Sequence, residues 1–131
     1  MKLLLKVMNL IDTSVLVAFF RTREDHHLEA EQLLLSLDRI VVTEAVLLEL
    51  LSVLTIREQK STAQRAIKML HMNERVQFLR LTDEELNAAL RAFYGGSSSL
   101  SFVDESLLVL HKTRKARVYS FDRKLINALK R

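Results

Sequence analysis

Short apolar runs alternate along the chain with longer segments in which apolar and charged residues recur at helical spacing. The apolar runs predict buried strands at residues 3–11, 39–43, 75–81 and 116–121. The segments between them predict helices at residues 15–20, 25–37, 43–57, 61–72, 82–94, 102–115 and 124–130. Strands that alternate with helices form parallel sheets covered on both faces, so the pattern predicts an α/β fold.

Polar residues mark where several of these helices begin. Thr43 is placed to act as an N-cap, and Thr82 with Glu85 forms the pattern of a capping box. Ser101 is expected to cap the helix that follows the segment "GGSSSLS" at residues 95–101. That segment is too short to separate two domains, so we expect a flexible loop within a single domain spanning residues 1–131.

Composition and charge agree with one folded domain in a reducing compartment. Hydrophobic residues make up 49% of the 131 residues, which is enough for a core, and there is no Cys for a disulfide or a thiolate metal site. The net charge of +4 helps a polyanion to approach but does not dictate that partner. Lys6 and Asp12 interrupt the apolar N-terminus, and no run reaches the roughly 18 apolar residues of a membrane helix. We therefore expect a soluble, cytoplasmic protein with no membrane partner.

Three aspartates are predicted to meet at one edge of the sheet. Asp12 follows the first strand, Asp122 follows the last, and Asp104 lies in the first turn of the helix before that last strand. The helix from Asp104 descends about 17 Å, and the strand up to Asp122 climbs back about 17 Å. The two aspartates therefore finish at the same edge, where ligands of parallel sheets bind.

Glu49 is the fourth candidate acid. It lies in "TEAVLLELLSVL", a helix that is apolar nearly all round and is therefore expected to be buried. Glu44 is the other acid of this helix, but an acid in the first turn is explained by its favourable interaction with the helix dipole. Helix capping is an open alternative for Asp12, Asp104 and Asp122, and a solvated helix position is the alternative for Glu49.

Four converging carboxylates would repel one another, and a hard divalent cation removes that penalty. Such a cation can clamp a phosphodiester and activate water, so the pattern indicates phosphodiester hydrolysis. Other chemistries fit less well, since no phosphate-binding glycine loop is present. A haloacid-dehalogenase-like site needs a second Asp two residues after the first, but the residue two after Asp12 is Ser14. The four histidines lack the spacing of metal ligands and are assigned to surface or packing.

Four motifs in this order resemble the PIN domain family: "IDTSVL", "TEAVLLELLSVL", "SFVDESLLVLH" and "VYSFDRKL". They are most similar to the small VapC-type toxins of prokaryotic toxin–antitoxin pairs. The resemblance implies a three-layer α/β/α sandwich with a short, mostly parallel central sheet. It also implies RNA cleavage that depends on Mg²⁺ or Mn²⁺, a cognate antitoxin as partner, and a homodimer.

The family's acidic set carries over onto this chain. The resemblance assigns catalysis and metal binding to Asp12, Glu49, Asp104 and Asp122. It assigns auxiliary polar roles to Thr13 or Ser14 and to Ser120, because the position directly before the last Asp is Phe121 rather than a small hydroxyl residue. Because the substrate is a polyanion, basic residues near the same edge are expected to hold RNA: Arg21, Arg23, Arg123 and Lys124.

Two other functions remain open from the sequence. One is a PIN-fold module that binds RNA or a protein partner without cutting, although such a module has no need for four repelling acids. The other is a housekeeping RNA-processing nuclease that has no antitoxin. A neighbouring reading frame for a small DNA-binding protein would favour the toxin.

Overall fold

The computed structural model describes residues 7–131, which contain four strands and seven helices. The strands are β1 (Asn9–Ile11), β2 (Ile40–Thr43), β3 (Val76–Leu79) and β4 (Arg117–Tyr119). The helices are α1 (Thr13–Phe20), α2 (His27–Ser36), α3 (Glu44–Arg57), α4 (Lys60–Met72), α5 (Asp83–Gly95), α6 (Phe102–Arg114) and α7 (Arg123–Leu129). The predicted alternation of strands and helices is confirmed. The first strand begins at Asn9 rather than residue 3, and residues 3–6 of that prediction lie outside the described residues.

The four strands form one sheet in the order β3-β2-β1-β4, and every neighbouring pair is parallel. Leu10 in β1 pairs with Val41 on one side and with Val118 on the other. The carboxyl ends of β1 and β4 therefore lie next to each other, with Ile11 opposite Tyr119. This arrangement confirms the predicted parallel sheet.

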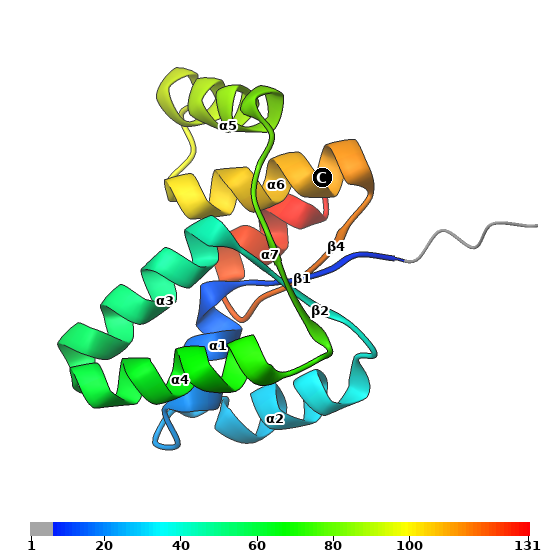
Figure 1. Cartoon of the computed structure of the whole chain (residues 1–131). Helices are drawn as coiled ribbons and strands as arrows, with labels where there is room; N and C mark the ends of the chain where they lie inside the picture. The colour runs from blue at the N-terminus through cyan, green and yellow to red at the C-terminus, as the bar shows by residue number, and fades with distance from the viewer. Residues whose placement is uncertain (1–6) are drawn as a thin grey trace, which may run out of the picture.

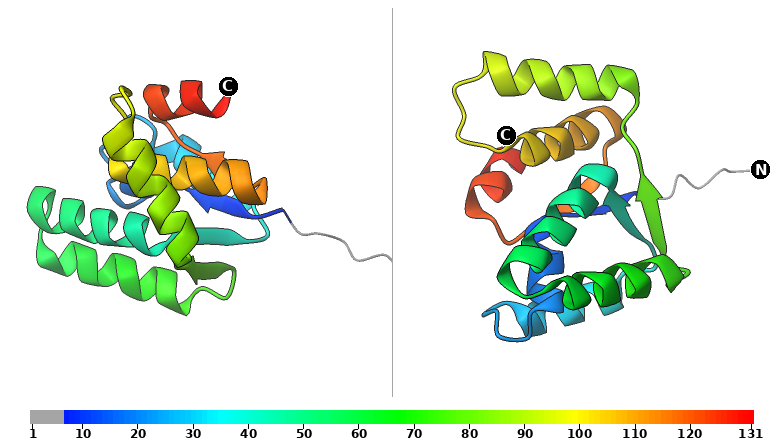
Figure 2. Two further views of the ribbon diagram at one scale, coloured as in Figure 1. Left: turned by 90° about the horizontal axis from the view of Figure 1, so that it is seen from above. Right: turned by 60° about the vertical axis from the view of Figure 1, so that its left-hand side comes forward.

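Helices cover both faces of the sheet, as expected for an α/β/α sandwich. Figure 1 shows α1, α2, α3 and α4 on one side and α5, α6 and α7 on the other. The two views in Figure 2 show α3 and α4 lying side by side, and α5 packed on the far side of α6 from the sheet. No helix in residues 7–131 is long and apolar enough to span a membrane.

The core lies between these layers. In β2, the three residues Ile40, Val41 and Val42 are all buried, which is typical of a strand covered on both faces. In α6, the run from Leu107 to Leu110 is also buried, because α5 covers the side of α6 that faces away from the sheet.

The expectation that α3 is buried nearly all round is wrong. Leu48 and Ile56 are 63% and 82% exposed, and only Val46, Leu50 and Leu54 are buried. These three recur every four residues and so form one stripe. The other sides of α3 would be buried only if another element packed against them. The neighbouring helix α4 packs against part of that surface.

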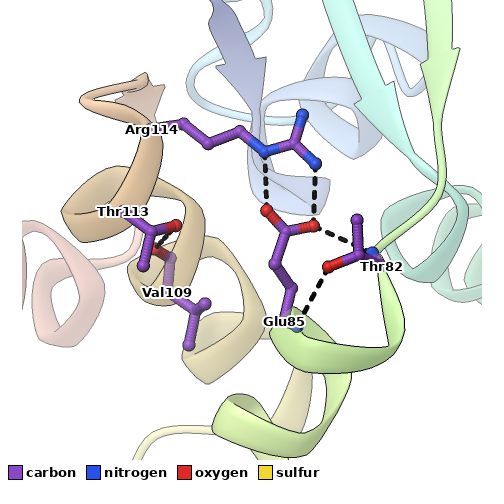
Figure 3. A network of polar contacts seen from close by, with 5 residues as sticks. All are labelled: Thr82, Glu85, Val109, Thr113 and Arg114. Atoms are coloured by element: carbon purple, nitrogen blue, oxygen red, sulfur yellow. Dashed lines mark hydrogen bonds and ion pairs between the residues drawn. The ribbon is translucent and has the colours of Figure 1, made fainter.

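An ion pair fastens α5 to α6 (Figure 3). Arg114 donates from Nε and Nη2 to the two carboxylate oxygens of Glu85, at 2.6 and 2.7 Å. Glu85 also completes the predicted capping box with Thr82. Mainly because of the hydrogen bond from Arg114, the pKa of Glu85 falls from 4.5 to about 2.

We predict that Glu85→Gln lowers the free energy of unfolding at pH 7 by about 1–2 kcal/mol, a discounted value for a partly exposed charged pair. Gln keeps an oxygen for the capping box, so the change isolates the charge. Because the folded pKa is about 2 against 4.5, the stabilisation is complete above pH 4.5 and is lost as the pH falls through about 2.

Urea denaturation from pH 7 downward measures this difference. Glu84→Gln is the matched control, since Glu84 lies on the same turn and makes no ion pair within residues 7–131. Equal losses in the two variants would remove the Arg114 pair as the cause.

Candidate active site

Parallel pairing of β1 with β4 brings Asp12 close to the segment that leads into Asp122. Asp12 directly follows β1, and its backbone N–H donates to the carbonyl of Tyr119 at 2.9 Å. Ser120 and Phe121 then connect the end of β4 to Asp122. The predicted meeting of the first and last aspartates at one edge of the sheet is therefore present in the fold.

Asp12 is buried, with 4% of the residue exposed, and its carboxylate is held by two serines. Its Oδ2 accepts hydrogen bonds from Ser14 Oγ and from Ser120 Oγ, both at 2.7 Å. Each hydroxyl has a single proton, so both protons are used on Asp12. The serine oxygens in turn accept backbone N–H groups, Ser14 from Phe121 at 3.0 Å and Ser120 from Asp122 at 2.9 Å. These bonds tie the start of α1 to the segment that follows β4. They leave Asp12 Oδ1 without a hydrogen-bond donor among residues 7–131.

Thr13 differs from the two serines, although it was an equal candidate in the sequence. It lines the same cavity, but its hydroxyl is buried and has no hydrogen-bond partner within the described part of the chain. A water or a bound ligand would satisfy such a group. The polar contacts of Asp12 therefore come from Ser14 and Ser120.

Asp104 is the third residue of α6 and forms a capping box with Ser101. Its Oδ2 accepts from Ser101 N at 3.2 Å, and its own N–H donates to Ser101 Oγ at 3.1 Å. Burial raises the pKa of Asp104, and the hydrogen bonds from Ser101 oppose that rise. The negative charges of Asp12 and Asp122 raise the pKa further, so the three carboxylates are close enough to repel one another.

Helix capping was the alternative role for the three aspartates, and the structure gives a different answer for each. Asp122 does cap α7, because its Oδ1 accepts from Lys124 N at 2.9 Å. Asp104 caps α6 through the box with Ser101. Asp12 occupies the N-cap position of α1, but its side chain makes no capping bond and turns to the two serines instead. Capping therefore accounts for two of the aspartates and leaves Asp12 without a local structural reason.

Glu49 joins the three aspartates in lining one open cavity of about 510 Å³. It is half-buried, and it makes no hydrogen bond or ion pair within residues 7–131. Glu44 lies outside this cavity and pairs with Arg80 at 3.2 Å. The fold thus brings all four predicted acids to one place, and their chemical roles stay predictions.

The basic residues predicted to hold RNA are placed differently from one another. Arg21 is occupied by ion pairs with Glu24 and with Glu58, the latter at 3.0 Å. Arg23 and Arg123 are exposed and do not line the cavity, whereas Lys124 does. Lys124 is therefore the predicted RNA-binding residue that the fold places beside the acids.

Residues that no sequence pattern had indicated also line the cavity. Arg57 lies two helical steps of four residues beyond Glu49, with Val53 between them, and all three line the cavity. That spacing could have identified Arg57 once Glu49 was chosen. His26 lines the cavity too and stacks on Phe121, with ring centroids 4.7 Å apart. No sequence signal points to this contact, because it joins loops that are distant along the chain.

Carboxylate oxygens are the ligands that hard divalent cations prefer. Five carboxylates line the cavity, the four predicted acids and Glu24, which is ion-paired with Arg21. Within residues 7–131, however, no three His, Cys, Asp or Glu side chains lie close enough together to hold one ion jointly. A cation here would therefore contact fewer protein groups directly and keep several waters, as Mg²⁺ commonly does.

We predict that Asp104→Asn raises the melting temperature at pH 7 in the absence of divalent cations. Asn keeps an oxygen for the Ser101 N–H but removes the buried charge. Because the folded pKa lies above 3.8, ionisation costs stability as the pH rises above 3.8, and the gain should vanish below that pH.

Thermal unfolding across pH tests this, with Asp83→Asn as the control. Asp83 is an exposed acid in the first turn of α5. Loss of its charge should lower the free energy of unfolding by about 0.3 kcal/mol, because an acid at this end of a helix interacts favourably with the helix dipole. An Asp104→Asn protein that is less stable at pH 7 would mean that capping by the carboxylate outweighs its burial.

Comparison with known proteins agrees with this geometry. The family model of the PIN domain matches residues 10–130. No curated protein sequence matches the chain.

Several solved structures share the fold at low sequence identity. VapC20 of Mycobacterium tuberculosis, described as a toxin that cleaves the sarcin-ricin loop, is 20% identical, with a TM-score of 0.82 over 92% of this chain and 94% of its own. VapBC2 of Rickettsia felis, solved bound to a DNA fragment from its promoter, is 13% identical, with a TM-score of 0.67 over 92% of each chain. A toxin–antitoxin complex from Klebsiella pneumoniae is 15% identical, with a TM-score of 0.60 over 87% of this chain and 86% of its own. The chain belongs to the PIN domain family and has the fold of VapC toxins.

Proposed function

We propose that this protein is an endoribonuclease that hydrolyses RNA phosphodiester bonds with the help of Mg²⁺ or Mn²⁺, and that it is the toxin of a toxin–antitoxin pair. The observation that carries the proposal is the convergence of Asp12, Asp104, Asp122 and Glu49 on one cavity. Membership of the PIN domain family supports a nuclease, and the VapC neighbours support a toxin.

Asp12, Asp104, Asp122 and Glu49 would hold the cation, directly or through its waters. Asp12 offers its free Oδ1, because Ser14 and Ser120 occupy Oδ2. Asp104 and Asp122 likewise each use one oxygen for a helix cap and keep the other. When bound, Mg²⁺ or Mn²⁺ supplies a Lewis acid that neutralises phosphate charge and lowers the pKa of an attacking water.

The side chains of the chain itself have distinct tasks in this proposal. Ser14 and Ser120 fix the orientation of Asp12, so that its free oxygen does not have to reorganise during the reaction. Glu49 has no hydrogen-bonded or ion-paired partner in residues 7–131, so its carboxylate would be free to accept a proton from water. Arg57 and Lys124 line the same cavity and would contact phosphates of the RNA.

A cognate antitoxin would inhibit the enzyme by supplying positive charge to this cavity. An Arg side chain could form bidentate hydrogen bonds with the carboxylates and compete with the cation. The neighbouring structures from Rickettsia felis and Klebsiella pneumoniae include a toxin–antitoxin complex, which supports a partner of this kind. The homodimer implied by the family resemblance stays a prediction.

We predict that Asp12→Asn lowers the rate of RNA cleavage by on the order of 100-fold or more, the scale expected when one preorganised charged group is removed from an active site. The fold should survive, because an Asn oxygen can still accept hydrogen bonds from Ser14 and Ser120. The assay uses tRNA and other defined structured RNAs, with and without Mg²⁺ or Mn²⁺ and with antitoxin shown to be absent.

Melting curves provide a readout that does not depend on activity. Excess Mn²⁺ should stabilise the unchanged protein by about 2.7 kcal/mol at a concentration 100 times the Kd, and Asp12→Asn should lose most of this shift. Asp25→Asn, an exposed acid that does not line the cavity, is the control. Wild-type cleavage by Asp12→Asn would show that the site is misplaced.

We predict that Glu49→Gln reduces cleavage by about 100-fold or more, the low end of the contribution of a general acid–base group, whereas Glu44→Gln leaves it nearly unchanged. Glu49 lines the cavity, and Glu44 pairs with Arg80 outside it. The two variants carry the same chemical change on the same helix, so each controls for the other. The reverse ranking of their rates would overturn the assignment of Glu49.

A further inference from the structure

We propose that His26 and Phe121 form a stacking platform for one unpaired RNA base at the edge of the acidic cavity. The inference rests on the proposed function, because it assumes that the polymer entering the cavity is RNA. It adds a binding subsite whose ligand is a nucleobase rather than a phosphate.

The two rings form a close, nearly parallel stack. Their centroids are 4.7 Å apart and their planes differ by 24°. Both side chains line the cavity that contains Asp12, Asp104 and Asp122. Two other pairs of His and Phe in residues 7–131, His27 with Phe19 and His71 with Phe78, are 6.4 Å apart and lie outside this cavity.

The stack is held in place at both ends. The backbone N–H of Phe121 donates to Ser14 Oγ, the same hydroxyl that donates to Asp12, so the position of Phe121 is linked to that of the acid. At the other end, Nδ1 of His26 lies 3.1 Å from Oε1 of Glu29, which restrains the edge of the imidazole ring. A preorganised ring loses less conformational entropy when a ligand binds.

More than half of the His26 side chain is accessible to a ligand. The side chain of His26 is 53% exposed, although Phe121 covers one face of its ring. The face of the ring opposite Phe121 is the one onto which a further ring would stack. Bases of unpaired RNA stack on aromatic side chains in this way, with little dependence on sequence.

Neighbouring groups suit a nucleotide rather than an apolar ligand. Lys124 lines the cavity three residues after Phe121 and can contact a phosphate attached to the stacked nucleotide. His26, Phe121 and Asp122 line one cavity, so the backbone of a strand held on the platform can reach the acids. The platform would thus orient the strand across the site where its backbone is cut.

Binding of a short oligoribonucleotide tests the proposal. The probe is a short single-stranded RNA in which one 2-aminopurine is the only base and every other position is an abasic ribose, compared with the fully abasic strand. Asp12→Asn is present in every protein to prevent cutting. His26→Ala should weaken binding of the base-containing strand by roughly 5- to 150-fold, which corresponds to the 1–3 kcal/mol typical of one stacked base. It should also abolish the quenching of 2-aminopurine fluorescence while leaving the Kd of the abasic strand unchanged.

Two variants define the controls. His26→Phe keeps an aromatic face and removes the ring nitrogens, so it should bind as the parent protein does. His71→Ala removes an exposed imidazole that lies 6.4 Å from Phe78 and outside the cavity, so it should not change RNA binding.

Three results would overturn the platform. They are unchanged binding by His26→Ala, equal losses for the base-containing and abasic strands, and a loss in His26→Phe as large as that in His26→Ala. Equal losses for the two strands would mean that His26 only packs the loop before α2. A large loss in His26→Phe would mean that the ring nitrogens of His26, rather than its aromatic face, contact the RNA. Failure of the nuclease proposal is seen separately, as absence of metal-dependent cleavage by the protein without the Asp12 substitution.

Discussion

The parallel pairing of β1 with β4 is the constraint on which the acidic cavity depends. It places the residues that follow β1 directly beside those that follow β4. Ser14 and Ser120 then use their single protons on the same oxygen of Asp12, and their own oxygens accept N–H groups from Phe121 and Asp122. A shift of one residue in this pairing would separate every one of these partners, because successive residues of a strand point to opposite faces.

The aspartates serve folding and the candidate site at the same time. Asp104 and Asp122 begin α6 and α7 with one carboxylate oxygen each, which offsets part of the cost of burying their charge. Asp12 receives two hydroxyl donors instead, although it stands at the start of α1. The raised pKa of Asp104 reflects the cost that remains, from burial and from the two neighbouring acids. A cation bound in the cavity would remove that cost, so cation binding and stability are expected to be coupled.

Neighbouring acids determine whether a basic side chain near the cavity is free to bind a phosphate. Arg21 is basic and was expected to hold RNA, but Glu24 and Glu58 already neutralise it. Arg57 has no ion pair within the described residues and lies on the same face of α3 as Glu49. Basic residues therefore differ in their value for RNA binding according to their partners, which charge alone does not reveal.

Much of this architecture follows from local patterns in the sequence. The alternation of apolar runs with amphipathic segments predicted the parallel sheet, and Thr82, Glu85 and Ser101 predicted helix starts that the structure confirms. Counting the rise along a helix and the following strand also brought Asp104 and Asp122 to one edge. These features depend on backbone geometry and on contacts between residues close in the chain, so the sequence carries them directly.

Other features were decided only by the tertiary structure. The sequence could not tell that α3 leaves Leu48 and Ile56 exposed, because an apolar helix is buried only where another layer covers it. It could not choose between Thr13 and Ser14, since the choice depends on where Ser120 lies after β4 pairs with β1. The stack of His26 on Phe121 was likewise out of reach, because it joins two loops whose separation along the chain exceeds any local pattern. Local spacing determines which residues can share a face or an edge, and only the packed fold determines which side chains touch.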